Sequence, residues 1–116
     1  YSIMVLILLM KRSNIWHQKI YLLGFNVLKI LEDLVILARE RKNKPVEGSY
    51  TNKLLDDKTL AKEKVLEEIN ELIEAVEKNS NQIHEAADVL YHLIMYLEKS
   101  GIKVEEVMKE LKNRRK

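Results

Sequence analysis

Two pairs of carboxylates in the second half of the chain have the spacing of a metal-binding site. Glu68 and Glu71 are three residues apart, and so are Glu85 and Asp88. Residues at positions i and i+3 share one face of a helix. If a turn folds two such helices together, four carboxylates converge, and they repel one another unless a cation lies among them. Hard oxygen ligands favour Mg²⁺, with Mn²⁺ as the alternative.

The first acid pair requires a helix that begins near Lys58 and ends near Lys78. On a helical wheel its apolar residues form one arc, which predicts a buried stripe. Glu68, Lys64 and Glu71 lie along one border of this arc. The acids Glu67 and Glu74 lie on the opposite side and are predicted to be solvated. The spacing of Lys64 and Glu68 also fits an ordinary surface ion pair. The buried stripe is predicted to comprise Val65, Leu66, Ile69, Leu72, Ile73 and Val76.

The second acid pair requires a helix over about residues 82–99, where apolar residues cover more than half of the circumference. Glu85, Asp88 and His92 form a narrow polar stripe on it. Because charges in a mostly buried helix are costly unless they are paired or bound to metal, this stripe indicates a site. His92 also fits a hydrogen-bonded partner inside a bundle, whereas His84 is predicted to lie on the surface without companions. The intervening residues 79–81 are predicted to cap both helices.

Two further helices are predicted, over residues 26–42 and 104–113, by apolar residues at helical spacing. Pro45 and Gly48 mark a loop after the first of them. This loop brings hydroxyl groups and a lysine close together in the order Ser49, Tyr50, Thr51 and Lys53. Composition alone favours an ordinary connection between helices, and a binding loop is the alternative.

The helical patterns, the short turn and the scarcity of glycine and proline predict an all-α fold, a small helical bundle built on an antiparallel helix pair. The 116 residues are 47% hydrophobic and 33% charged, with three glycines and one proline. A net charge of +2 gives no indication of a nucleic-acid partner, and the absence of cysteine excludes disulfides and fits a reducing cytoplasm. The apolar run of residues 3–10 is too short to cross a membrane and lacks the features of a secretory signal. We expect an N-terminal extension over residues 1–25 and one domain over residues 26–116.

The acid pairs on an antiparallel helix pair resemble the all-α nucleoside triphosphate pyrophosphohydrolases, the superfamily of the MazG proteins and dimeric dUTPases. Within it, the chain is similar to the phosphoribosyl-ATP pyrophosphohydrolase family of histidine biosynthesis, over about residues 27–115. Three segments carry this narrower resemblance, residues 47–55, 64–71 and 85–93. The loop Gly-Ser-Tyr-Thr-Asn-Lys-Leu-Leu is its most specific part. Leu66 and Glu74 depart from the family pattern, and these departures concern local packing.

The resemblance implies hydrolysis of phosphoribosyl-ATP to phosphoribosyl-AMP and pyrophosphate. It implies Mg²⁺ held by the four acids, with Glu71 as ligand or general base, and Lys64 and Lys53 as phosphate donors. His92 would orient Asp88 or touch the substrate. The family also implies a homodimer and a functional link to a separate phosphoribosyl-AMP cyclohydrolase. The mouth of the site would be shaped by Ser49, Tyr50 and Thr51.

Two other interpretations stay open at this point. A MazG-type housekeeping pyrophosphohydrolase would share the metal site and differ in base specificity, and the loop of residues 48–55 argues against it. A non-catalytic helical interaction module would explain the amphipathic helices. That module predicts no metal binding, whereas the polar stripe of Glu85, Asp88 and His92 predicts a site.

Overall fold

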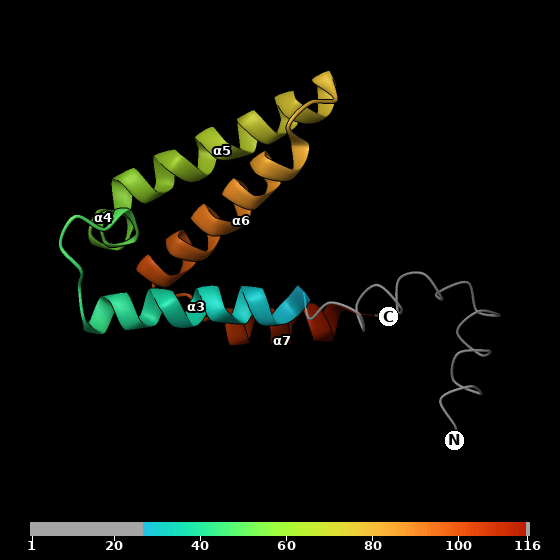
Figure 1. The fold of residues 1–116 in the computed structure, drawn as a ribbon. Helices are drawn as coiled ribbons and strands as arrows, with labels where there is room; N and C mark the ends of the chain where they lie inside the picture. The colour runs from blue at the N-terminus through green and yellow to red at the C-terminus, as the bar shows by residue number, and fades with distance from the viewer. Residues whose placement is uncertain (1–26, 116) are drawn as a thin grey trace, which may run out of the picture. The chain divides into compact units, whose positions relative to one another are not determined.

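The computed structural model describes residues 27–115, and the predicted extension over residues 1–25 lies outside them. The chain divides into two compact units, residues 1–32 and 33–116. Of the first unit, the structure describes only the beginning of one helix. The described residues form five helices and no strand, which confirms the all-α prediction (Figure 1). The domain boundary near residue 25 stays a prediction.

The fold is built on an antiparallel pair of helices, α5 (Lys58–Lys78) and α6 (Gln82–Lys99), which lie side by side (Figure 1). Their predicted bounds are confirmed. Asn79 ends α5 in the left-handed conformation, with φ of 53°, and its N–H bonds to the carbonyls of Ala75 and Val76. Asparagine tolerates this conformation better than most residues, so the three-residue turn is encoded locally. Asn81 is the N-cap residue of α6, as predicted, but its side chain makes no capping hydrogen bond and its amide instead donates to Glu85 Oε1 at 3.5 Å.

A short helix, α4 (Tyr50–Asp56), follows the loop and packs against both α5 and α6. The sequence pattern indicated a loop here, so this helix is a difference from the prediction. A helix of seven residues is too short to be stable alone, and its stability comes from tertiary contacts. Ser49 caps it by accepting a hydrogen bond from the Asn52 N–H, and Asn52 donates to the Arg41 carbonyl at 2.9 Å.

The core lies where α3 (Val27–Asn43), α4 and α6 meet. Its fully buried side chains are Ala38, Leu54 and Met95, with Leu55 beside them. Truncating one buried leucine of this kind costs about 2–5 kcal/mol. The core is small, and it lies on the side of α4 that faces α6, so it fixes the position of the loop residues relative to the acid pairs.

One ion pair, between Arg39 and Glu105, joins the C-terminal helix α7 (Val104–Arg114) to α3, and two more join α3 to α6. Arg39 contacts Glu98 at 3.1 Å and Glu105 at 2.6 Å. The Arg39 guanidinium lowers the pKa of Glu105 to about 2. The Glu98 carboxylate is buried and also pairs with Lys42 at 3.5 Å. No helix among the described residues is long and apolar enough to cross a membrane.

The predicted burial of the apolar stripe of α5 is wrong for four of its six residues in this single chain, whereas Val65 and Leu72 are half-buried. Leu66, Ile73 and Val76 are each more than half exposed, and Ile69 is 38% exposed. The face of α5 that is buried instead carries Ala61, Glu68 and Ala75. The Glu68 side chain is therefore buried in the helix pair, whereas Leu66, Ile73 and Val76 face solvent.

Candidate metal centre

Three carboxylates converge between α5 and α6. One oxygen each of Glu68, Glu71 and Glu85 lies within 4.8 Å of the others. The antiparallel pairing of α5 and α6 causes this, because it lays the border of α5 that carries Glu68 and Glu71 along the side of α6 that carries Glu85. We call Glu68, Glu71 and Glu85 the carboxylate cluster.

Two oxygen atoms of the carboxylate cluster are buried without a hydrogen-bond donor. The Glu68 side chain is 7% exposed, and its Oε2 has no hydrogen-bond partner. The Oε2 atom of Glu85 is likewise buried and unpartnered. Burial raises the pKa of Glu68 and of Glu85, and the neighbouring Glu71 carboxylate raises both further. Buried carboxylate oxygens without hydrogen-bond donors are suited to bind a cation, so these three side chains fit Mg²⁺ or Mn²⁺ as ligands.

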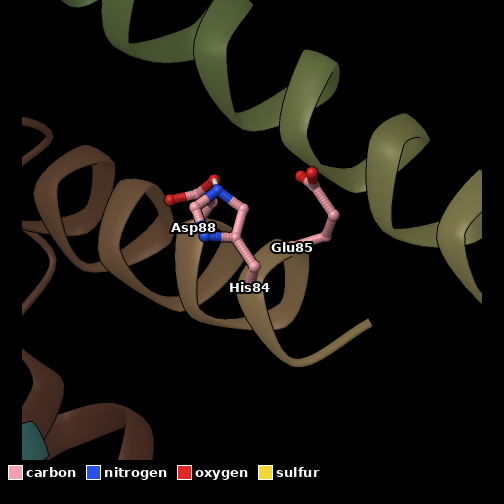
Figure 2. Close-up of side chains that lie close together, drawn as sticks. All are labelled: His84, Glu85 and Asp88. Atoms are coloured by element: carbon pink, nitrogen blue, oxygen red, sulfur yellow. Dashed lines mark ion pairs between the residues drawn. The ribbon is translucent and has the colours of Figure 1, made fainter. Parts of the chain in front are cut away.

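Asp88, the fourth predicted ligand, lies beside the carboxylate cluster in a second group of three. Its partners there are Glu85 and His84, again with one ligand atom of each within 4.8 Å of the others (Figure 2). The closest contact is 3.3 Å, between Asp88 Oδ2 and His84 Nε2. The prediction that His84 has no companions is therefore wrong. Glu85 belongs to both groups and links them.

Lys64 lies one turn before Glu68 and is the cation nearest to the carboxylate cluster among the described residues. Its Nζ atom is 3.5 Å from Glu68 Oε1, which confirms the predicted pair, and 3.1 Å from Glu67 Oε2. The hydrogen bond to Glu67 raises the pKa of Lys64, so the ammonium form is favoured. Glu67 and Glu74 are exposed, as predicted.

The loop residues join the site through hydrogen bonds to α6. The Tyr50 hydroxyl lies 2.9 Å from His92 Nε2, and His92 Nδ1 lies 2.7 Å from the Asp88 carbonyl. A carbonyl only accepts, so Nδ1 carries the hydrogen and a neutral imidazole accepts from Tyr50 at Nε2. The hydroxyl groups of Thr51 and Tyr91 are hydrogen-bonded to each other at 2.5 Å. Burial raises the pKa of the Tyr50 hydroxyl, which keeps it protonated at neutral pH.

The other two predicted loop residues differ in their surroundings. Ser49 accepts a 2.7 Å hydrogen bond from Arg41 Nη1 in addition to capping α4. Lys53 lies in the last turn of α4 with an exposed side chain and no ion pair to another described residue. The structure thus brings Lys64, the acids, Tyr50 and His92 into one region. Substrate binding by each of them stays a prediction.

Two residues of this region were absent from the predicted site. Tyr91 stacks on Tyr50 with ring centroids 6.4 Å apart, and it holds Thr51. His84 pairs with Asp88. The signal for His84 was present in the sequence, because its i,i+4 spacing from Asp88 places both on one helix face. The apolar residues around Tyr91 in the sequence predicted a side chain that only packs in the core. Its hydrogen bond to Thr51 could be seen only once the position of α4 was known.

Chemically, this arrangement suits a reaction in which negative charge must be neutralised. Anionic oxygens that converge on one point hold a cation, and a lysine at their edge donates to a second anion such as a phosphate. The hydroxyls of Tyr50 and Thr51, at the beginning of α4, add neutral polar groups.

Comparison with known proteins agrees with this geometry. The family model described as phosphoribosyl-ATP pyrophosphohydrolase matches residues 31–115. A phosphoribosyl-ATP pyrophosphatase of Clostridium acetobutylicum is 42% identical over 91 residues, covering 74% of this chain and 81% of that protein. One of Methanococcoides burtonii is 40% identical over 93 residues, covering 76% and 94%. The histidine biosynthesis bifunctional protein HisIE of Pyrococcus furiosus is 44% identical over 92 residues, covering 77% of this chain but 43% of that protein.

Proposed function

Since this chain belongs to the phosphoribosyl-ATP pyrophosphohydrolase family, we propose that it hydrolyses phosphoribosyl-ATP to phosphoribosyl-AMP and pyrophosphate with the help of Mg²⁺. The reaction class is hydrolysis of a phosphoanhydride, in histidine biosynthesis. The observation that carries the metal dependence is the pair of buried, unpartnered carboxylate oxygens of Glu68 and Glu85.

In this proposal Glu68, Glu71, Glu85 and Asp88 hold the ion. Bound Mg²⁺ supplies charge neutralisation at the phosphate oxygens and a more acidic water. The unpartnered oxygens supply ligand positions that no protein group competes for. Glu71 has a second role as general base, because a carboxylate at the edge of the cluster can accept the proton of an attacking water.

Lys64 binds the phosphates as a charge-assisted donor. In the structure its ammonium group already points to the acids, at 3.5 Å from Glu68 Oε1. When a polyphosphate binds, the ammonium exchanges the exposed Glu67 carboxylate for a phosphate oxygen. Lys53, with an exposed side chain, is the second phosphate donor.

The α4 residues shape the mouth of the site. Tyr50 and Thr51 are fixed by hydrogen bonds to His92 and Tyr91, so their hydroxyls are ordered before substrate arrives. Ordered donors lose less entropy on binding, which favours selectivity. His92 then acts by orienting Tyr50 and by its contact with the Asp88 backbone.

The active form is proposed to be a homodimer. Leu66, Ile69, Ile73 and Val76 follow the 3-4-3 spacing of a helix-packing seam, and they are exposed in the single chain. On α6, Ile83 is 87% exposed and Leu90 is 51% exposed. Monomeric proteins rarely expose contiguous apolar patches of this kind. A second copy offers the same apolar faces, so it covers them without a different partner.

A link to the next reaction is also part of the proposal. Two relatives carry the printed name of a bifunctional histidine biosynthesis protein, and the chain covers 43% and 34% of their lengths. A second activity on the same polypeptide fits a partner that consumes the product. We propose a phosphoribosyl-AMP cyclohydrolase as this functional partner.

The test is pyrophosphate release from phosphoribosyl-ATP, compared with dUTP and dCTP, with and without Mg²⁺. We expect turnover of phosphoribosyl-ATP only, and only with Mg²⁺. Equal turnover of the deoxynucleotides would favour the MazG-type alternative instead. Asp88→Ala should lose most of the activity, whereas Glu77→Ala, an exposed acid on α5 outside the cluster, should keep it. Full activity of Asp88→Ala would overturn the ligand assignment.

A further inference from the structure

His84 occupies a position at the edge of the carboxylate cluster that the family reaction does not explain. It lies in the first turn of α6, directly before Glu85 and four residues before Asp88. Figure 2 shows its imidazole lying along the helix beside the Asp88 carboxylate, while the Glu85 carboxylate points toward α5. The His84 side chain is 66% exposed, so solvent and ions reach it.

The distances fit two ligands of one ion. His84 Nε2 is 3.3 Å from Asp88 Oδ2. Two ligands that bind an octahedral ion at right angles, with bonds of about 2.1 Å, are about 3 Å apart. Glu85 adds a third ligand atom within 4.8 Å of both.

Two observations besides the clustering of acids point to a ligand here. The Oε2 atom of Glu85, a residue that belongs to both groups, is buried and has no hydrogen-bond partner. The Glu68 side chain, more than nine-tenths buried, presents a second unpartnered oxygen in the adjoining carboxylate cluster. Buried acceptors without donors are rare in folded proteins, and a cation satisfies both.

We propose that His84 is a nitrogen ligand, with Asp88 and Glu85, for a divalent transition-metal ion, so that this chain binds Mn²⁺ more tightly than Mg²⁺. Mg²⁺ is bound almost entirely through oxygen, whereas imidazole suits the transition metals. A site made only of Glu68, Glu71, Glu85 and Asp88 would have no such preference for nitrogen. The inference rests on the proposed function in one respect, that the carboxylate cluster binds metal.

The experiment measures Mn²⁺ binding by the full chain, without substrate, from the loss of the free-ion electron paramagnetic resonance signal. His84→Ala should weaken Mn²⁺ binding about tenfold or more, on the scale of losing one metal-orienting group. Mg²⁺ binding, measured by isothermal titration calorimetry because Mg²⁺ gives no resonance signal, should be unchanged in the same variant. Glu77→Ala is the matched control on α5 and should bind both ions like the wild type. In pulsed measurements, nitrogen coupling to bound Mn²⁺ should be present in the wild type and absent in His84→Ala.

The outcomes separate this inference from the proposed function. If His84→Ala binds Mn²⁺ like the wild type and no nitrogen coupling is seen, His84 is only an exposed ion-pair partner of Asp88, and the inference is overturned. Mg²⁺ binding and Mg²⁺-dependent turnover would then still support the proposed function. If the wild type binds neither ion, both fail together.

Discussion

Replacing Glu68 by glutamine removes the charge of the side chain and keeps its shape. It therefore tests two expected effects of the carboxylate cluster separately, its cost to stability without metal and its contribution to activity with metal. The side chain is 7% exposed, with one oxygen 3.5 Å from Lys64 and the other unpartnered. Burial and Glu71 both raise the pKa of Glu68, so its ionised form costs free energy in the metal-free protein. The amide of glutamine can donate to Glu71. We expect Glu68→Gln to raise the free energy of unfolding of the metal-free protein by about 1 kcal/mol at pH 7.5.

The same change should remove activity. A metal ion contributes several kcal/mol of transition-state stabilisation, so losing its most buried ligand should lower kcat/KM roughly 10²–10³-fold. The assays are urea unfolding without metal and pyrophosphate release with Mg²⁺. Glu77→Gln on the same helix is the control and should change neither quantity. A Glu68→Gln protein that is less stable without metal, or that keeps wild-type turnover, would refute the reasoning.

Three other predictions follow from the structure. Without metal, the Tm should rise when the pH falls from 7.5 to 5.5. The stabilising contribution of Glu68 and Glu85 is complete below the carboxyl pKa of the unfolded chain, and it is lost as the pH rises through their raised pKa values in the folded state. Saturating Mg²⁺ should reverse the trend, and a flat metal-free profile would contradict the prediction. Arg39→Met should cost about 1–3 kcal/mol in urea unfolding, because it leaves the buried Glu98 carboxylate with Lys42 as its remaining partner; wild-type stability would count against this. Ile73→Glu should give a monomer by light scattering, and an unchanged dimer would place the interface elsewhere.

The sequence was sufficient for the elements whose signals are local. Apolar periodicity and the asparagine turn predicted the bounds of α5 and α6, and the acid spacing predicted that Glu68, Glu71 and Glu85 meet. The helix α4 could not be predicted in this way, because Pro45 and Gly48 dominate the local pattern. Its seven residues are held by contacts to α6 that lie about 40 positions away in the chain.

The sequence also did not predict which face of α5 packs against α6. A wheel separates the apolar stripe from the acid border, but it does not say which of them meets α6. The usual assumption that the apolar stripe is buried failed, because the buried face of α5 carries Ala61, Glu68 and Ala75 instead. The seven-residue spacing of these three residues was the available signal.

This orientation links stability, assembly and metal binding. The isolated chain buries the carboxylate of Glu68 without a donor for Oε2 and leaves Leu66, Ile73 and Val76 in water, so both faces of α5 are costly. In the proposed function a bound cation would remove the first cost, and a second copy of the chain would remove the second. Any species that binds only the folded state stabilises it by mass action. The Tm should therefore rise with protein concentration without metal and rise again on adding Mg²⁺, whereas Ile73→Glu should remove only the dependence on protein concentration. A Tm that responds to neither variable would mean that the apolar stripe and the acids serve another purpose.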